Sequence, residues 1–318
     1  MRTTSIRLGV SACLLGQEVR YDGGHKRDAF LTDTLGAFVE WVPVCPEVEI
    51  DLGTPRETIR LVGSPESPRL VAPRSGLDLT ERMQRYAFNK ARELARLDLC
   101  GYVLKKDSPS CGMERVKIHS EGRPGEKKGV GLFARALMDA LPILPVEEEG
   151  RLNDPELREN FITRVFSYRR WRDLLEGKFS PGALVSFHTD HKLLLMAHSP
   201  AHYTRLGRLT AAGGSGMPRL ELQEAYGALF MEALARIATI RKNTNVLQHA
   251  MGYFKTRLTA DEKQELIETI DNYHRGLVPL IVPITLLRHH VRRFGEPWLA
   301  RQIYFSPHPK ELMLRNHV

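Results

Sequence analysis

The sequence lacks a long uninterrupted hydrophobic run. Its longest apolar stretch, Leu277 to Leu287, contains Pro279 and Pro283 and is shorter than the roughly 20 residues that a membrane-spanning helix needs. The amino-terminal segment is interrupted by Arg7 and has no continuous apolar core of the kind that secretory signals carry. We therefore expect a soluble, cytoplasmic protein with no membrane partner.

Cysteine is also scarce. The 318 residues include four cysteines, and all of them lie in the first half of the chain. Disulfides are rare in a reducing compartment, so two disulfides are an unexpected use of these four thiols. Clustered cysteines in such proteins more often bind metal or take part in catalysis.

Charge and histidine are distributed unevenly along the chain. Residues 1–150 hold 22 basic and 22 acidic side chains, whereas residues 151–318 hold 24 and 16, so the whole net charge of +8 belongs to the second half. Ten of the 12 histidines also lie there. A chain of this length usually needs more than one core. These shifts, with a turn-rich connector near Pro155, predict two domains, 1–150 and 151–318.

Short β-prone segments alternate with helical ones in the first domain. This alternation predicts an α/β fold with an open, mostly parallel, Rossmann-like sheet. The expected strands are 5–12, 38–44, 101–106 and 142–146, and the expected helices are 28–38, 81–97 and 130–140. Thr80 is a suitable N-cap for the second of these helices.

Helical periodicity dominates the second domain, which we expect to be all-α. Thr259 and Glu262 form a capping-box pattern before one of its helices. The predicted helices are 155–175, 199–209, 220–241, 245–255, 259–275 and 278–293.

Three of the cysteines, Cys13, Cys45 and Cys111, each follow a predicted strand. Ligands bind open α/β sheets beyond the carboxyl ends of the strands, so we expect these thiols to converge there. Three thiolates leave an open position on zinc, and they also leave one iron of a 4Fe-4S cluster without a protein ligand. Cys100 precedes its strand, and we interpret it as a buried apolar side chain.

Ionisable and hydroxyl side chains flank these cysteines. Glu47 and Glu49 follow Cys45, and on an extended segment both would point to one side. A carboxylate within hydrogen-bond reach is a candidate general base for activating water. Ser108 and Ser110 precede Cys111, while Arg56 and Lys105 are candidate contacts for an anionic substrate. For Glu47 and Glu49 a solvated position fits the spacing equally well, whereas for Arg56 and Lys105 a surface role is the more common one.

Three motifs together resemble the thiouracil desulfidase family, TudS. They are SACLLG at 11–16, VCPEVEIDLGTPR at 44–56 and KKDSPSCG at 105–112. The resemblance covers roughly residues 5 to 147 and implies a 4Fe-4S cluster on Cys13, Cys45 and Cys111. It also implies non-redox removal of sulfur from a thiolated pyrimidine base or nucleotide, of the thiouracil or 4-thiouridine monophosphate type.

The same resemblance implies two catalytic groups. A glutamate four residues after the second cysteine corresponds to Glu49, and a serine three residues before the third corresponds to Ser108. We assign Arg56 and Ser110 to substrate binding. Asp51 stands where the family is expected to have glycine, and an added carboxylate there is a candidate influence on substrate preference.

The second domain resembles the YbgA-type helical domain. The segments that carry this resemblance are 191–207, 245–255 and 304–318. Its basic residues, such as RHHVRR at 288–293, predict a candidate RNA contact in which Tyr203, Tyr253, Phe254 and Tyr304 stack on bases. Two alternatives to the desulfidase follow from the residues: a cysteine-ligated zinc hydrolase or deaminase, and a non-enzymatic iron-sulfur protein that binds nucleic acid.

Overall fold

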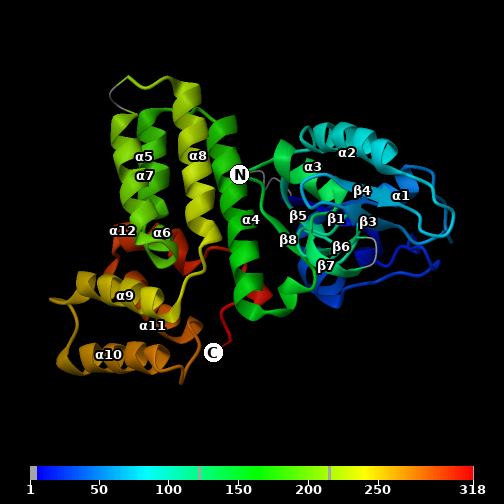
Figure 1. Ribbon diagram of the computed structural model, residues 1–318. Coiled ribbons are helices and arrows are strands. Elements are labelled where there is room, and N and C mark those ends of the chain that lie inside the picture. The colour runs from blue at the N-terminus through cyan, green and yellow to red at the C-terminus, as the bar shows by residue number, and fades with distance from the viewer. Residues whose placement is uncertain (1–5, 121–122, 214–215, 318) are drawn as a thin grey trace. The chain divides into compact units, whose positions relative to one another are not determined.

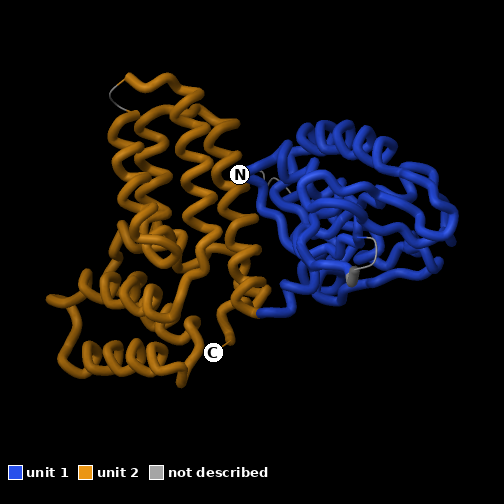
Figure 2. Tube along the Cα trace, viewed as in Figure 1, with its two compact units in different colours: residues 1–154 blue, residues 155–318 orange. Residues whose placement is uncertain are grey.

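The chain divides into two compact units. The computed structural model describes residues 6–120, 123–213 and 216–317. The first unit comprises residues 1–154 and the second residues 155–318 (Figure 2). The division falls between Asp154 and Pro155, in the turn-rich connector. Within the described residues, no helix combines the length and apolar character needed to cross a bilayer.

A parallel sheet forms the centre of the first unit, with the strand order β2-β1-β5-β8. Figure 1 labels β1, β5 and β8 of this sheet. Its most central strands are the most apolar, and β5 is buried along its whole length, as expected for a strand covered on both faces. The predicted parallel α/β fold is confirmed. The strands are β1 (Ile6–Ser11), β2 (Val39–Val44), β5 (Leu99–Leu104) and β8 (Val146–Glu148).

Helices α2 (Thr80–Leu94) and α3 (Leu132–Ala140) pack against each other beside this sheet. Their aromatic side chains meet the sheet at Phe133, whose ring lies 5.9 Å from that of Tyr102 on β5. The predicted N-cap is wrong in detail, because Leu79 holds that position and the Thr80 hydroxyl accepts a hydrogen bond from the Leu70 amide at 2.8 Å. The predicted helical stretch 28–38 is present as a π-helical segment, η2 (Phe30–Thr34), followed directly by a 3₁₀-helical one, η3 (Leu35–Ala37).

A second sheet in the first unit was not predicted. Its order is β4-β3-β6-β7, with antiparallel outer pairs and a parallel centre. These strands are short or rich in charge, so they lack the β-branched runs by which strands are recognised in a sequence. They are β3 (Arg60–Gly63), β4 (Pro68–Val71), β6 (Val116–Ser120) and β7 (Arg123–Gly129).

The second unit is helical in its described residues, as predicted. Its core includes an aromatic cluster in which Trp171 stacks on Tyr226 with ring centroids 5.2 Å apart. The capping box of Thr259 and Glu262 is present. The helices are α4 (Pro155–Glu176), α5 (Pro181–Asp190), α6 (Lys192–His198), α7 (Pro200–Ala212), α8 (Arg219–Ala235), α9 (Ile240–Met251), α10 (Ala260–His274), α11 (Ile281–Phe294) and α12 (Pro297–Ala300).

Two helices of this unit, α5 and α6, were not predicted. Apolar side chains lie on several sides of both helices, so the sequence of residues 181–198 shows no clear polar face. Short helical turns complete the chain: η1 (Ala12–Leu15), α1 (Pro46–Glu49), η4 (Arg151–Asn153), η5 (Gly252–Phe254), η6 (Ile303–Phe305) and η7 (Lys310–Leu312).

Candidate active site at the carboxyl edge of the parallel sheet

Three neighbouring strands deliver Cys13, Cys45 and Cys111 to one pocket. Cys13 lies in η1 directly after β1, Cys45 is the N-cap of α1 directly after β2, and Cys111 follows the loop that leaves β5. Because β2, β1 and β5 are adjacent and parallel, their carboxyl ends share one edge. The pocket has a volume of about 420 Å³ and is lined by all three cysteines. Cys100 is fully buried within β5 and does not line it.

The three thiols lie close enough to influence one another electrostatically. Burial raises the pKa of Cys13 to about 11, with Lys105 opposing the rise and Cys45 adding to it. Burial also raises the pKa of Cys111, and Glu47, Cys45 and Cys13 add to that rise. These thiols therefore carry protons at neutral pH, and a metal centre that binds them must displace those protons.

Three cysteine thiolates are a donor set that suits either zinc or an iron-sulfur cluster, which distributes them over separate irons. Within the described residues, no group of three or more His, Cys, Asp or Glu side chains is arranged to hold a single metal ion. The buried hydroxyl of Tyr102 has no hydrogen-bond partner among the described residues. Burial raises the pKa of Tyr102, with Cys111 the next contributor, so this hydroxyl is a suitable donor to a cluster sulfur.

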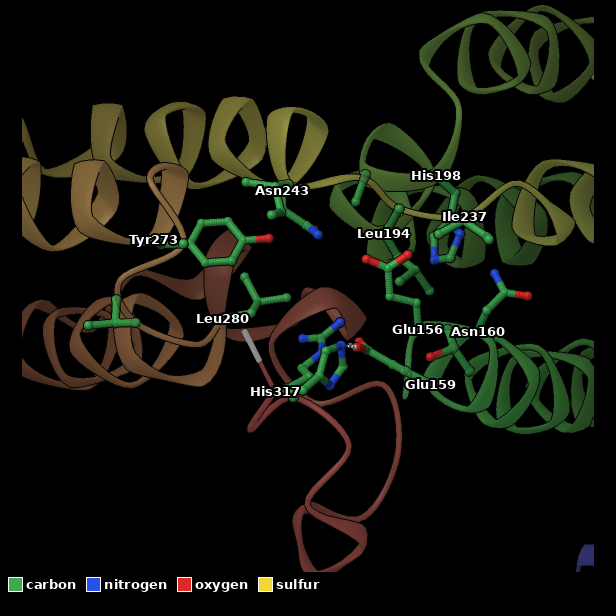
Figure 3. A pocket seen from close by; sticks show the side chains of 17 residues that line it. Glu156, Glu159, Asn160, Leu194, His198, Ile237, Asn243, Tyr273, Leu280 and His317 are labelled. Carbon is green, nitrogen blue, oxygen red and sulfur yellow. Dashed lines mark hydrogen bonds and ion pairs between the residues drawn. The ribbon is translucent and has the colours of Figure 1, made fainter. Parts of the chain in front are cut away.

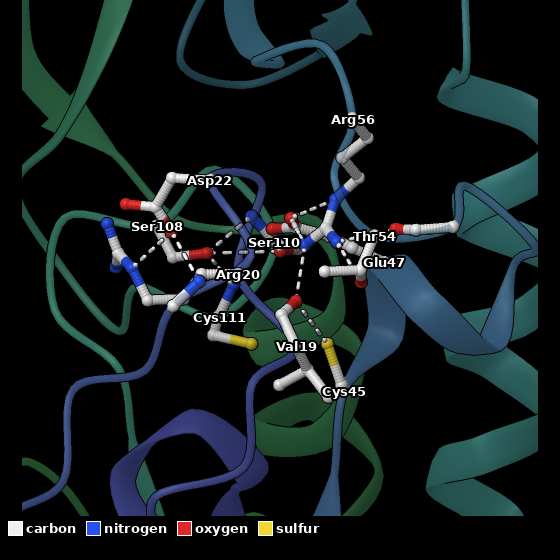
Figure 4. Close-up of polar contacts among 12 residues, drawn as sticks. Val19, Arg20, Asp22, Cys45, Glu47, Thr54, Arg56, Ser108, Ser110 and Cys111 are labelled. Carbon is white, nitrogen blue, oxygen red and sulfur yellow. Dashed lines mark hydrogen bonds and ion pairs between the residues drawn. The ribbon is translucent and has the colours of Figure 1, made fainter.

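A chain of hydrogen bonds runs from Ser108 to a buried ion pair (Figure 4). The Ser108 oxygen accepts hydrogen bonds from the Ser110 and Cys111 amides, at 3.3 and 3.1 Å. Its own proton is directed to the Ser110 oxygen, 3.0 Å away, because the Ser110 hydroxyl donates to Glu47 Oε1 at 2.5 Å. Ser108 therefore donates to Ser110, Ser110 donates to Glu47, and the Glu47 carboxylate is the final acceptor.

Arg56 completes this network from the other side of Glu47. Its Nε and Nη2 donate to Glu47 Oε2 at 3.1 and 2.5 Å, and the guanidinium also donates to Val19 O, Gly53 O and Thr54 Oγ1. The side chain is 5% exposed. Arg56 lines the pocket, and its guanidinium donates to protein atoms and holds Glu47 in place. Its expected role in substrate binding stays a prediction.

Glu49, the glutamate implied by the family resemblance, does not line the pocket. Its carboxylate accepts a hydrogen bond from the Cys45 amide at 3.2 Å and pairs with Lys90 Nζ at 3.0 Å. Glu47 lines the pocket instead. Asp51 has a φ of 55°, a backbone conformation that glycine adopts more readily than other residues. Its exposed carboxylate pairs with Arg82 and does not line the pocket.

Basic side chains surround the cysteines. Lys105 pairs with Glu149 at 2.5 Å and lowers the pKa of Cys13 against the effect of burial. The others come from the loop after η1 and from the loop after β5, and they are Arg20, Lys26 and Lys106. This lining favours anions, whether thiolates, sulfide or a substrate phosphate.

Comparisons with known proteins match each unit to a family. The 2-thiouracil desulfurase family matches residues 8–149, and a family described as a protein of unknown function, DUF1722, matches residues 192–309. The chain is 30% identical to YbgA of Escherichia coli (strain K12) over 165 residues, which cover 52% of this chain and 98% of that protein. The chain belongs to the 2-thiouracil desulfurase family in its first unit and to the DUF1722 family in its second.

Two further similarities concern the desulfurase unit. The chain is 32% identical to YbbK of Bacillus subtilis (strain 168) over 154 residues, which cover 46% of this chain and 97% of that protein. A solved structure titled [4Fe-4S]-dependent thiouracil desulfidase TudS is 33% identical, with a TM-score of 0.41, and the match covers 49% of this chain and 97% of that one. YbgA and YbbK are both described as uncharacterized proteins.

The aromatic residues expected to stack on RNA in the DUF1722 unit have other partners. Phe254 and Tyr304 are fully buried, so neither can stack on a base. Tyr253 stacks on Trp298 with centroids 4.8 Å apart, and Tyr203 stacks on His188 at 5.4 Å. The comparisons lend no support to RNA contact, and two of the four side chains expected to stack on bases are buried.

Proposed function

We propose that the chain is a non-redox desulfidase that converts a thiolated pyrimidine base or nucleotide into its oxo counterpart. Water supplies the oxygen of the new carbonyl, and the thiocarbonyl sulfur leaves with both protons of that water as hydrogen sulfide, so the reaction needs no electron donor. The observation that carries this proposal is the meeting of three cysteines and a serine–glutamate relay in one pocket of a desulfurase-family unit.

Cys13, Cys45 and Cys111 are the proposed ligands of a 4Fe-4S cluster. When bound by three thiolates, such a cluster supplies a thiophilic Lewis acid, because one iron has no protein ligand. The buried hydroxyl of Tyr102 interacts electrostatically with Cys111 and Cys45 and suits hydrogen bonding to sulfur. Four basic side chains, Arg20, Lys26, Lys105 and Lys106, offset the negative charge of the thiolates.

The proton chemistry is assigned to Ser108 and Glu47. Ser108 lines the pocket, and its proton can pass through Ser110 to Glu47 as Ser108 takes a proton from the attacking water. Arg56 keeps the Glu47 carboxylate oriented toward Ser110. Glu47 thus takes the role that the sequence resemblance assigned to Glu49, and Ser110 becomes a relay residue rather than a substrate contact.

Anaerobic turnover tests this function directly. The purified holoprotein should convert 4-thiouracil, 2-thiouracil or 4-thiouridine monophosphate into the oxo compound with stoichiometric sulfide release. The basic lining predicts that the nucleotide is the best of the three. A cluster-loaded preparation that is inert on all of them would refute the proposal.

Metal analysis separates the two alternatives. A zinc hydrolase would be colourless and free of acid-labile sulfide, and a non-enzymatic iron-sulfur protein would contain iron and sulfide without turnover. Replacing any one of Cys13, Cys45 and Cys111 by Ala should abolish cluster absorbance. Cys100→Ala is the matched control and should retain both cluster and activity, since Cys100 lies within β5 outside the pocket.

A further inference from the structure

A groove in the DUF1722 unit lies between α11 and residues 305–316 of the carboxyl-terminal segment. Its volume is about 720 Å³. Pockets that bind small molecules have volumes of roughly 300–1,000 Å³, so this groove has room for a molecule of nucleotide size. The residues of α11 that line it recur at helical spacing and so form one stripe along the helix. They are Ile281, Thr285, Arg288 and Arg292.

Three basic side chains line this groove without a partner. Arg288 and Arg292 belong to α11, and Lys310 belongs to the opposite wall. Within the described residues, none of these three side chains has a hydrogen-bond or ion-pair partner. Glu311 is the one acidic residue among the described residues of the lining. The groove therefore has an excess of positive charge, which attracts anions.

The arginines of the basic run at 288–293 have different surroundings. Arg293 pairs with Glu262 of α10 and does not line the groove. Arg292 lies in the last turn of α11, where a basic side chain is favourable by itself, but Arg288 lies one turn earlier. Side chains at this spacing are neighbours on a helix, with Cβ atoms about 5–6 Å apart. A guanidinium presents a fixed fork of donors that matches two oxygens of a phosphate, so this pair suits a phosphate group.

Two further basic residues of the lining add little to this charge. Arg315 also lines a smaller cavity, of about 60 Å³, where its Nε donates to Glu159 at 2.8 Å (Figure 3). Its charge is therefore already balanced by a carboxylate. Burial lowers the pKa of His308 to about 3, so this ring is neutral at physiological pH. The excess charge of the groove comes from the two arginines of α11 and from Lys310.

Hydrogen bonds hold the carboxyl-terminal wall of the groove in place. Arg170 of α4 donates to the Pro307 carbonyl oxygen at 2.6 Å, and Arg315 donates to the Tyr304 carbonyl oxygen at 2.6 Å. The Ile281 amide, at the start of α11, donates to the Arg315 carbonyl oxygen at 3.2 Å. These bonds join the two walls without a ligand. A wall that is already ordered loses less conformational entropy when a ligand binds.

Apolar side chains form the rest of the carboxyl-terminal wall. Inorganic phosphate alone would leave their surface in water, whereas the organic part of a larger ligand would cover it. Met313 is 63% exposed, and the flexible side chain of methionine adapts to ligands of different shape. The apolar residues of this wall are Phe305, Pro307, Pro309, Met313 and Leu314.

We propose that this groove binds a phosphate monoester whose organic part is about the size of a nucleoside. The phosphate lies between Arg288, Arg292 and Lys310, and the organic part lies against Met313 and the neighbouring prolines. A monoester carries a charge of about −1.5 to −2 at neutral pH, which complements the excess of basic side chains. The groove belongs to a different unit from the cysteine pocket, so the proposal is tested in protein with or without a cluster.

AMP is the probe for isothermal titration calorimetry on the full chain. It is a purine nucleotide, so it is not a product of the proposed desulfuration of a thiolated pyrimidine. AMP should bind saturably and at least tenfold more tightly than inorganic phosphate, and adenosine at the same concentrations should not bind. Equal affinities for AMP and inorganic phosphate, or no saturable binding of AMP, would overturn the proposal.

Variants with matched changes of charge locate the site. The double variant Arg288→Gln/Arg292→Gln should weaken AMP binding at least tenfold, and Lys310→Gln, from the opposite wall, should weaken it at least threefold. The control is Arg205→Gln/Arg208→Gln, which removes two exposed arginines of α7 outside the groove and should bind AMP as wild type does. Wild-type affinity in both groove variants, or an equal loss in the control, would show that AMP binds elsewhere and refute the proposal.

A short single-stranded RNA without terminal phosphates tests whether the groove serves nucleic acid instead. Its phosphodiesters carry one negative charge each, so it should bind the groove no more tightly than AMP. RNA that binds more than tenfold more tightly than AMP, and that loses this affinity in Arg288→Gln/Arg292→Gln, would assign the groove to nucleic acid and overturn the proposal.

Discussion

At the residue scale, the roles of Glu47 and Glu49 depend on the local backbone. On an extended segment residues two apart share a face, which is how the sequence placed both glutamates together. In the structure Pro46–Glu49 is a helical turn, where successive residues turn by about 100°, so residues two apart point to nearly opposite sides. One carboxylate therefore reaches Ser110 while the other accepts from the Cys45 amide.

Glu47→Gln should lower kcat for desulfuration by about 100-fold or more, in the range typical of a lost general base. Glu49→Gln is the matched control, and its kcat should stay within a few-fold of wild type because Glu49 does not line the pocket. The measurement is anaerobic sulfide release by cluster-loaded protein with equal iron content. A larger loss of kcat in Glu49→Gln than in Glu47→Gln would show that Glu49 is the catalytic group.

Tyr102→Phe should not destabilise protein without a cluster, because it removes a buried hydroxyl that has no partner among the described residues. In cluster-loaded protein it should speed bleaching of the cluster absorbance in air. Tyr226→Phe is the comparison, since its hydroxyl lies 3.1 Å from His188 Nδ1 and its loss should cost about 1 kcal/mol. Urea unfolding measures the change in the free energy of unfolding, and absorbance measures the rate at which the cluster bleaches. An unchanged rate of bleaching in Tyr102→Phe would contradict a contact between this hydroxyl and sulfur.

At the element scale, local capping signals identified some helix starts and missed others. The Thr259 and Glu262 pair satisfies two amides at the start of α10, so a short sequence motif located this end correctly. Thr80 offered the same hydroxyl, yet it bonds the Leu70 amide of β4 instead. A cap is thus reliable when both of its partners are local, and it fails when a neighbouring strand competes.

Thr259→Ala should destabilise α10 by about 1 kcal/mol, the usual effect of losing an N-cap. Thr285→Ala in α11 is the control, because the Thr285 hydroxyl bonds a carbonyl within its own helix and is exposed. Amide hydrogen exchange of residues 260–266 reports the local effect. Equal protection of these amides in both variants would show that the capping box contributes nothing measurable.

At the scale of the whole molecule, the two units differ in their buried titratable groups. The DUF1722 unit contains buried histidines, and burial lowers the pKa of His191 to about 3, with Arg170 adding to the effect. Burial likewise lowers the pKa of His308 to about 3 and of His198 to about 4. In the unfolded chain the pKa of these rings is about 6.5. The stability that these neutral histidines contribute is therefore fully present above about pH 6.5 and is lost as the pH falls.

Acidification should destabilise the DUF1722 unit, because these histidines bind protons in the unfolded state and do not bind them in the folded state. Between pH 7 and pH 5 each of these histidines should cost about 2 kcal/mol. Urea unfolding followed by circular dichroism measures the loss at each pH. His191→Gln should flatten the dependence, whereas His317→Gln, at a partly exposed position, should leave it unchanged. A wild-type stability that is independent of pH in this window would contradict the assignment.

The sequence alone determined the fold class and the helical character of the second unit, because the periodicity of strands and helices is a local property. It also determined that the three cysteines meet in one pocket, because the carboxyl ends of adjacent parallel strands share one edge of the sheet. It did not reveal the second sheet, whose short strands carry little apolar pattern. Tertiary structure decided which glutamate faces Ser110 and that Arg56 donates to protein atoms. It also decided that Phe254 and Tyr304 are buried, while Tyr203 and Tyr253 stack on neighbouring rings. These outcomes depend on which side chain from a distant part of the sequence packs beside each residue, and this neighbour cannot be predicted from the spacing of residues along the chain.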